Sequence, residues 1–383
     1  MALVRRREFI AQTSRAAFGA SWFAVSGFEP GGPEAPGSKP YLDALTAGWD
    51  KDIDGWLRET RLPSASVALI HDGKLAWRKA YGVKDTGTNE RADTNTVYAA
   101  CSNTKPVFAY AVTKLCERGV MDLDTPLIKY LPERFVDDPR GDLITARHVL
   151  NHTTGFPNWR QEPAPLTMDF TPGERYQYSG EGFSYLQAVV SKVTGQSFEE
   201  FMQANILRPF GMTSSRIIWD VPYARRIAKP HDASGKRIAG KYETLPTAER
   251  RSHDITRYGA AASLLTTPTD YARFVLEILN PKPPDRFRLN AGNRRELLRP
   301  QVKKAEGEWE SLGWAIAQVP VPGVAIQFRH AGSDAGYYCL CNASEQTKSA
   351  IIMMTNGDSF PAFQAKAFPD PVAVMKGLFG TAP

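Results

Sequence analysis

The chain has 383 residues, enough for a substantial hydrophobic core and for about two domains or one large domain with an insertion. Hydrophobic residues make up 42% and charged residues 23%, which is typical of globular proteins and excludes extensive disorder. The formal charge is +6, but Arg5, Arg6, Arg7 and Arg15 against Glu8 place +3 of it in the first 26 residues. The remaining +3 does not indicate a nucleic-acid partner.

The first 26 residues are predicted to form an export signal. After a basic region, the apolar stretch 16–28 is too short by about a third to span a bilayer. The run Arg6-Arg7-Glu8-Phe9-Ile10 resembles a twin-arginine signal, and residues 24–26 offer a cleavage site. No nearby cysteine could receive a lipid anchor. We therefore expect a periplasmic or extracellular protein, without a stable membrane anchor after signal removal.

A linker and a hairpin follow the signal. Residues 27–40 contain four glycines and four prolines, which predicts a flexible linker before a folded domain at 41–380. Residues 66–82 alternate in hydrophobicity around Asp72-Gly73, a pattern that predicts a β-hairpin. An antiparallel sheet is expected to begin there.

Residues 107–118, followed by Gly119, are predicted to form a helix, and Ser102 precedes it. Ser102 could cap that helix by accepting a hydrogen bond from its first turn. Alternatively, because residues three apart share a helix face, Lys105 would lie beside the Ser102 hydroxyl and could take its proton. A helix N-terminus also favours a developing negative charge, so we favour the catalytic interpretation.

The later elements in chain order complete a two-part architecture. Short helices and proline-rich loops follow, and then three strand-like runs at 324–332, 336–344 and 349–356 and a helix at 371–380. The predicted fold class is α/β (α+β), an antiparallel sheet flanked by the terminal helices plus a mostly helical lobe at roughly 105–260. Small-molecule sites tend to lie in such clefts, so catalytic groups should come from both parts.

The four cysteines are predicted to be buried free thiols. Cys339 and Cys341 alternate along one predicted strand, whereas Cys101 and Cys116 lie at the two ends of one helical stretch. Neither arrangement suggests a disulfide framework.

Two further candidates for catalysis follow Ser102 and Lys105. Tyr178 lies in a loop before the predicted helical run 184–193. His330 ends a predicted strand and is followed by small residues, which let a ligand approach the backbone. Either side chain alone is more often structural, but their combination with Ser102 and Lys105 favours a catalytic site.

Other chemistries find less support. His148 and His152, four apart on a predicted helix, could bind a metal, but neither a Glu nor a third ligand accompanies them in the required pattern. We therefore expect no metal and no cofactor. The nucleophile elbow of α/β-hydrolases, the glycine-rich phosphate loop and the dinucleotide fingerprint are absent from the sequence.

Together these motifs resemble those of the serine β-lactamases and penicillin-binding proteins, most closely class C β-lactamases and family VIII esterases. The family's S-x-x-K, Y-x-N and Lys- or His-x-Gly motifs correspond to Ser102-Asn103-Thr104-Lys105, Tyr178-Ser179-Gly180 and His330-Ala331-Gly332. The resemblance covers roughly residues 45–380 and includes the stretches 130–133, 148–157, 206–212 and 259–274.

The resemblance implies an acyl-enzyme on Ser102. Lys105 and Tyr178 would together remove the serine proton, which requires that both pKa values be lowered, and Tyr178 would pass the proton to the leaving group. His330 would hydrogen-bond and orient this cluster. The backbone N–H groups of Ser102 and Ser333 would hold the oxyanion, and Gly180 and Gly332 would line the substrate site.

One departure from the family bears on the substrate. Gly180 replaces the family's asparagine, which binds an amide group of penicillins and peptides, although Glu181 could substitute for it. His330 in place of lysine favours the esterase-like and peptidase-like branches.

The leading hypothesis is therefore an exported hydrolase of carboxylic esters or small amides. The alternatives are a β-lactamase or D-Ala-D-Ala peptidase, and a ligand- or cell-wall-binding protein of the same fold without turnover. In each case the partner is a small molecule, and the oligomeric state is left open.

Overall fold

A computed structural model describes residues 39–239 and 257–381 of the chain. The predicted signal peptide and most of the predicted linker lie outside the described residues. The linker ends earlier than expected, because Lys39 and Pro40 already belong to helix α2 (Lys39–Thr60). No helix in the described ranges is long and apolar enough to cross a membrane.

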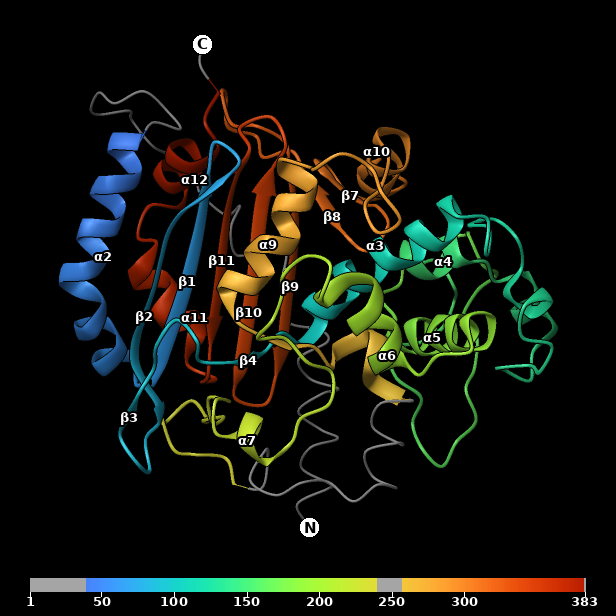
Figure 1. The fold of residues 1–383 in the computed structure, drawn as a ribbon, viewed down its shortest axis with the longest axis horizontal. Coiled ribbons are helices and arrows are strands. Elements are labelled where there is room, and N and C mark those ends of the chain that lie inside the picture. Colours follow the sequence, from blue (N-terminus) through green and yellow to red (C-terminus); the bar gives the residue numbers. More distant parts are fainter. Residues whose placement is uncertain (1–38, 240–256, 382–383) are drawn as a thin grey trace.

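A nine-stranded antiparallel sheet organises the fold, in the order β3-β2-β1-β11-β10-β9-β8-β7-β6 (Figure 1). Its strands are β1 (Ser64–His71), β2 (Lys74–Asp85), β3 (Glu90–Arg91), β6 (Val302–Ala305), β7 (Glu308–Glu310), β8 (Ala315–Ala317), β9 (Gln327–Asp334), β10 (Tyr337–Ser344) and β11 (Ser349–Thr355). Because β1 pairs with β11, the early and late segments share one sheet, as the sequence predicts.

The hairpin prediction is confirmed by the pairing of β1 with β2. Both residues of its turn have positive φ, 49° at Asp72 and 66° at Gly73. Such a two-residue turn matches the right-handed twist of the strands, and Asp-Gly is a favoured pair for it.

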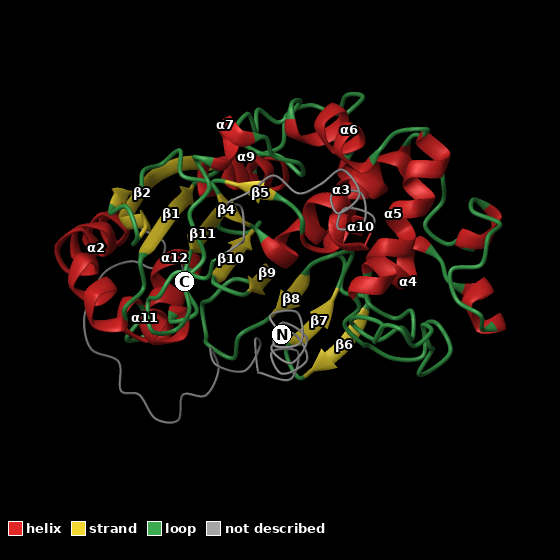
Figure 2. Cartoon of the chain, turned by 90° about the horizontal axis from the view of Figure 1, so that it is seen from below, coloured by secondary structure: helices red, strands yellow, loops and turns green. Residues whose placement is uncertain are grey.

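Strand β1 is buried along almost its whole length because both faces of the sheet are covered. Val67 and Leu69 join a hydrophobic cluster with Trp49 of α2 and with residues of α11 (Phe360–Ala367) and α12 (Pro371–Phe379). Ala68 and Ile70, which alternate with them, belong to a second cluster on the opposite face. Figure 2 shows α2, α11 and α12 on one side of the sheet and α9 (Pro268–Leu279) on the other. The terminal helices thus flank the sheet, as predicted.

The part of the chain between β3 and β6 contains mostly helices among the regular elements that the structure describes. Its longer helices are α3 (Thr104–Glu117), α5 (Gly180–Thr194) and α9, and its shorter ones are α4 (Ala146–Leu150), α6 (Phe198–Met202), α7 (Val221–Ala224) and α10 (Ala291–Leu298). Strands β4 (Tyr98–Ala99) and β5 (Leu265–Thr266) pair with each other outside the main sheet. Figure 1 shows α3, α4, α5, α6 and α10 to the right of β9, with α9 across the face of the sheet and α7 below it.

Helix α5 begins four residues before the predicted run 184–193. Ser179 caps it by accepting a hydrogen bond from Gly182 N at 3.1 Å. The helix ends at Gly195, whose φ of +65° is the left-handed conformation that commonly ends helices. The sequence did not predict this earlier start, because the first turn contains glycines and glycine has a low helix propensity.

The four cysteines are free thiols, as predicted. Cys101, Cys339 and Cys341 are buried, whereas Cys116 is half-buried. Cys339 and Cys341 lie two apart on β10, and both belong to the cluster on the helical face of the sheet.

Candidate active site

Ser102 lies in a 3₁₀ turn, Cys101–Asn103, that leads directly into α3. It does not cap the helix: the N-cap residue of α3 is Asn103, and no side-chain hydrogen bond caps either the turn or α3. Instead, Lys105 Nζ donates to Ser102 Oγ at 3.3 Å. The capping interpretation is therefore wrong, and the two side chains meet as helical spacing predicts.

The turn that carries Ser102 is strained and firmly held. Cys101 has a φ of +49°, which is unfavourable for a residue with a side chain, and such strain clusters at functional sites. Asn103 Nδ2 donates to the Cys339 carbonyl of β10 at 3.1 Å, and the Tyr271 hydroxyl of α9 donates to the Asn103 carbonyl at 3.1 Å. The sheet and α9 thus fix the position of the Ser102 hydroxyl.

Lys105 is buried, with only 1% of its surface exposed. Its Nζ donates to the Ala261 carbonyl at 2.9 Å and lies 4.7 Å from the centre of the Tyr178 ring. Burial lowers the pKa of Lys105 to about 7, because desolvation disfavours the ammonium form. An appreciable fraction is then a neutral amine near pH 7, which is the form that can accept the serine proton.

The Ala261 carbonyl is a functional group that sequence reasoning missed. Residue 261 lies within the family-like stretch 259–274, but a backbone acceptor leaves no side-chain signature in a sequence. Only the folded chain brings it to Lys105.

Tyr178 precedes Ser179, the N-cap residue of α5, and a side-chain hydrogen bond links it to Ser102. Burial raises the pKa of the phenol well above its ordinary value, and the bond to Ser102 opposes this only in part. The prediction that both pKa values are lowered therefore holds for Lys105 and is wrong for Tyr178. The physical reason is that burial disfavours a phenolate as it disfavours an ammonium, which moves the two pKa values in opposite directions.

His330 lies within β9, opposite Cys341 of β10, and the strand continues beyond it to Asp334. Burial and the positive charges of Lys105 and Lys304 lower the pKa of His330 to about 3, so the ring is neutral. Among the described residues, Nδ1 has no hydrogen-bond partner, and no hydrogen bond joins the ring to Ser102, Lys105 or Tyr178. The structure thus brings His330 near the cluster without the orienting bond that we expected.

The backbone of β9 lies against the turn that carries Ser102. A Cβ atom at Gly332 would be 2.6 Å from Ser102 N and 2.7 Å from the Ala100 carbonyl oxygen, so no larger residue fits. Ser333, the second predicted oxyanion donor, is the next residue of the same strand. The two predicted donors therefore lie on adjacent segments.

Gly180 is also in a crowded position. A Cβ atom there would lie 2.4 Å from the ring of Trp159, which packs edge-on against Tyr258 with ring centres 4.9 Å apart. The indole thus fills the space into which a side chain at position 180 would point.

Glu181 does not stand in for the missing asparagine. It is buried, and Arg160 binds its carboxylate at 2.7 and 3.0 Å through the guanidinium and at 2.9 Å through the backbone N–H. Both carboxylate oxygens are therefore occupied by Arg160.

His148 and His152 do not share a helix face, because α4 ends at Leu150. His148 forms a capping box with Thr145, whereas His152 has a φ of +59° and its Nδ1 accepts a hydrogen bond from Ser179 N at 3.1 Å. Within residues 39–239 and 257–381, no three His, Cys, Asp or Glu side chains form a group that could hold a metal ion.

The candidate site as a whole draws on both parts of the fold. Ser102, Lys105 and Tyr178 come from the helical part and contact one another, and β9 of the sheet brings His330 and Gly332 beside them. A nucleophile, a neutral amine and a protonated phenol in contact are suited to acyl transfer.

A model of the Beta-lactamase family matches residues 43–371. The chain is similar to esterase EstB of Burkholderia gladioli, with 31% identity over an alignment of 223 residues that covers 50% of this chain and 56% of EstB. It is also similar to protein flp of Staphylococcus aureus strain N315, with 23% identity over an alignment of 283 residues that covers 69% of this chain and 55% of flp. The chain thus spans about half the length of these curated relatives.

Two solved structures share the fold. D-alanine carboxypeptidase AmpC from Burkholderia cenocepacia has a TM-score of 0.71 and 19% identity, covering 87% of this chain and 99% of that one. An octameric penicillin-binding protein homologue from Pyrococcus abyssi has a TM-score of 0.66 and 22% identity, covering 88% of this chain and 79% of that one. The fold class predicted from the sequence is confirmed.

Proposed function

The chain belongs to the Beta-lactamase family, and from this premise we propose that it is a serine hydrolase that forms an acyl-enzyme on Ser102. One observation carries the proposal. The buried amine of Lys105 lies 3.3 Å from Ser102 Oγ, and its pKa is lowered to about 7. A serine hydroxyl is a weak nucleophile at neutral pH and needs such an adjacent base.

The proposed reaction begins with attack of Ser102 Oγ on the substrate carbonyl carbon, while Lys105 Nζ accepts the serine proton. The backbone N–H groups of Ser102 and Ser333 would hold the oxyanion. Tyr178, whose raised pKa keeps it protonated, donates its proton to the leaving alcohol or amine and regains one from Lys105. Water then attacks the acyl-enzyme and gives a proton to the same amine, which passes it to Ser102 Oγ as the acid leaves.

We propose carboxylic esters or small amides as substrates. With the Trp159 ring against Gly180 and the Glu181 carboxylate bound by Arg160, neither position 180 nor position 181 offers the amide-binding side chain of the family. A site without such a partner discriminates less in favour of amide-bearing substrates. The similarity to an enzyme named as an esterase supports the same choice.

The experiment compares p-nitrophenyl butyrate hydrolysis by the wild type and by Ser102→Ala, with Ser234→Ala as the matched control. Ser234 lies in an exposed turn, so its variant should keep wild-type activity. Ser102→Ala should lower kcat at least about 1000-fold, because the nucleophile is lost.

A chromogenic cephalosporin assayed in parallel separates the alternatives. Faster turnover of the cephalosporin than of the ester would favour a β-lactamase or peptidase. Wild-type activity in Ser102→Ala, or no reaction with either substrate, would reject acylation and favour a binding protein of this fold.

We also propose that the protein is exported, from the twin-arginine-like sequence at Arg6-Arg7. The full chain produced with its own N-terminus in a bacterium with this pathway should lose about 26 residues and leave the cytoplasm. The variant carrying both Arg6→Lys and Arg7→Lys should keep its full mass inside the cell. Equal export of the two proteins would refute the proposal.

A further inference from the structure

His152 is fully buried and lies beside the segment that carries Tyr178. Its carbonyl accepts a hydrogen bond from Gln177 N at 2.8 Å, and its Nδ1 accepts one from Ser179 N at 3.1 Å. One residue thus binds the backbone on both sides of Tyr178.

The His152 ring also contacts the phenol itself. The two ring centres are 4.3 Å apart with the planes inclined by 33°, and Phe183 lies against the same imidazole at 5.3 Å. Lys105 Nζ lies 4.7 Å from the Tyr178 ring centre. The phenol is therefore held by His152 and Lys105 together.

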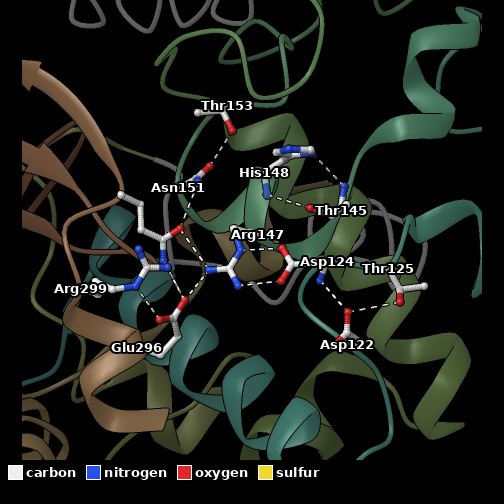
Figure 3. Close-up of polar contacts among 11 residues, drawn as sticks. Asp122, Asp124, Thr125, Thr145, Arg147, His148, Asn151, Thr153, Glu296 and Arg299 are labelled. Carbon is white, nitrogen blue, oxygen red and sulfur yellow. Dashed lines mark hydrogen bonds and ion pairs between the residues drawn. The ribbon is translucent and has the colours of Figure 1, made fainter. Parts of the chain in front are cut away.

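The segment that carries His152 is anchored from outside the site (Figure 3). Arg147 of α4 forms ion pairs with Asp124 at 2.6 Å and with Glu296 of α10 at 2.5 Å. The side chains of Asn151 and Thr153, on either side of His152, are joined by a hydrogen bond of 2.7 Å. These contacts give His152 a fixed position from which it can hold Tyr178.

The protonation of His152 suits a holding role. Because Nδ1 accepts from a backbone N–H, the neutral ring carries its proton on Nε2, and this buried atom has no partner among the described residues. Burial and the charge of Lys105 hold the pKa of the ring well below its ordinary value. Because the ring stays neutral, it does not compete with Lys105 for the serine proton.

We propose that His152 is a positioning residue that holds the Tyr178 phenol against Ser102. The inference rests on the proposed acyl transfer, in which Tyr178 moves the proton to the leaving group. It explains why a histidine in the left-handed conformation is buried here.

The test is a double-mutant cycle with His152→Ala, Tyr178→Phe and the double variant, assayed with p-nitrophenyl butyrate. Active sites are counted with a fluorophosphonate probe, so that kcat refers to competent molecules. His152→Ala should lower kcat about 100-fold with little change in KM, because a shift of the reacting group by about 1 Å has that cost. In the Tyr178→Phe background, His152→Ala should lower kcat by less than about threefold, because the two residues act as a unit.

A conservative variant tests the mechanism further. In His152→Asn the side-chain oxygen can take the place of Nδ1, and asparagine tolerates a φ of +59°. The kcat of His152→Asn should be at least about tenfold higher than that of His152→Ala, since the bond to Ser179 is kept. If His152→Ala does not fold, His152→Asn takes its place in the cycle and should still lose activity only when Tyr178 is present. His148→Asn, in the same segment, should keep wild-type kcat.

The outcomes separate this inference from the proposed function. An equal loss in both Tyr178 backgrounds, or fewer titrated sites with unchanged kcat per site, would show a merely structural role and overturn the inference. If the probe instead labels Ser102→Ala as well as the wild type, the proposed function itself fails, and the positioning role fails with it.

Discussion

A single physical effect gives neighbouring residues of the site different roles. Burial lowers the pKa of Lys105 to about 7 and raises the pKa of Tyr178, because the charged form is a cation in one and an anion in the other. The amine can then accept a proton at neutral pH while the phenol keeps its own. This division of roles needs no charged histidine.

The lowered pKa of Lys105 predicts how activity depends on pH. Below pH 7 the ammonium form predominates and cannot accept the Ser102 proton, so kcat/KM for p-nitrophenyl butyrate should rise with pH through about 7. Lys105→Arg should lower kcat/KM at least about 100-fold, because a guanidinium stays charged and cannot accept the serine proton. Lys129→Arg, at an exposed position, should show the wild-type profile. A profile that is flat between about pH 6 and 8, or that rises only near the ordinary lysine pKa of about 10.4, would contradict the role of Lys105.

Between elements, β9 packs closely against the turn before α3. The atoms nearest to a Cβ at Gly332 are Ser102 N, the Ala100 oxygen and Cys101 Cβ, at 2.6, 2.7 and 2.9 Å. None of these atoms can move away by a side-chain rotation, so a larger residue must displace the turn. The glycine therefore sets the distance between the strand and the nucleophile.

Gly332→Ala should thus impair both stability and catalysis. We expect the free energy of unfolding to fall by about 1–3 kcal/mol, as for other overpacked sites. The kcat per titrated site should fall about 100-fold, because Ser102 is displaced. Urea unfolding and active-site titration measure the two effects.

Gly48→Ala is the matched control for this substitution. Gly48 lies within α2 and has no atom within 4 Å of an added Cβ. Alanine there should stabilise the protein by about 0.5–1 kcal/mol without changing kcat. Wild-type kcat in Gly332→Ala would show that the turn does not depend on this close contact.

The whole molecule is a sheet built from both ends of the chain, with the site at the border of the helical part. Strand β1 pairs with β11, and Trp49 Nε1 of α2 donates to the Ala367 carbonyl of α11 at 3.3 Å. The segments after β4 and before α5 bring Ser102 and Tyr178, and β9 brings His330. Because each part supplies different groups, the site forms only when the whole fold has formed.

The sequence by itself determined the local features of this protein. The alternation around Asp72-Gly73 is enough to place the first hairpin, since strand period and turn chemistry act over a few residues. The spacing of Ser102 and Lys105 predicts their contact, because both lie on one helical stretch. The family motifs added Tyr178 and His330 as candidates.

Only the tertiary structure decided which groups meet at the site and in what protonation state. The Ala261 carbonyl at Lys105, the His152 ring on Tyr178 and the indole of Trp159 above Gly180 are contacts between segments that are distant in the sequence. The raised pKa of Tyr178 likewise follows from the burial that these segments create. Backbone acceptors and desolvation depend on where the chain packs in three dimensions, and neither leaves a residue pattern that a sequence can display.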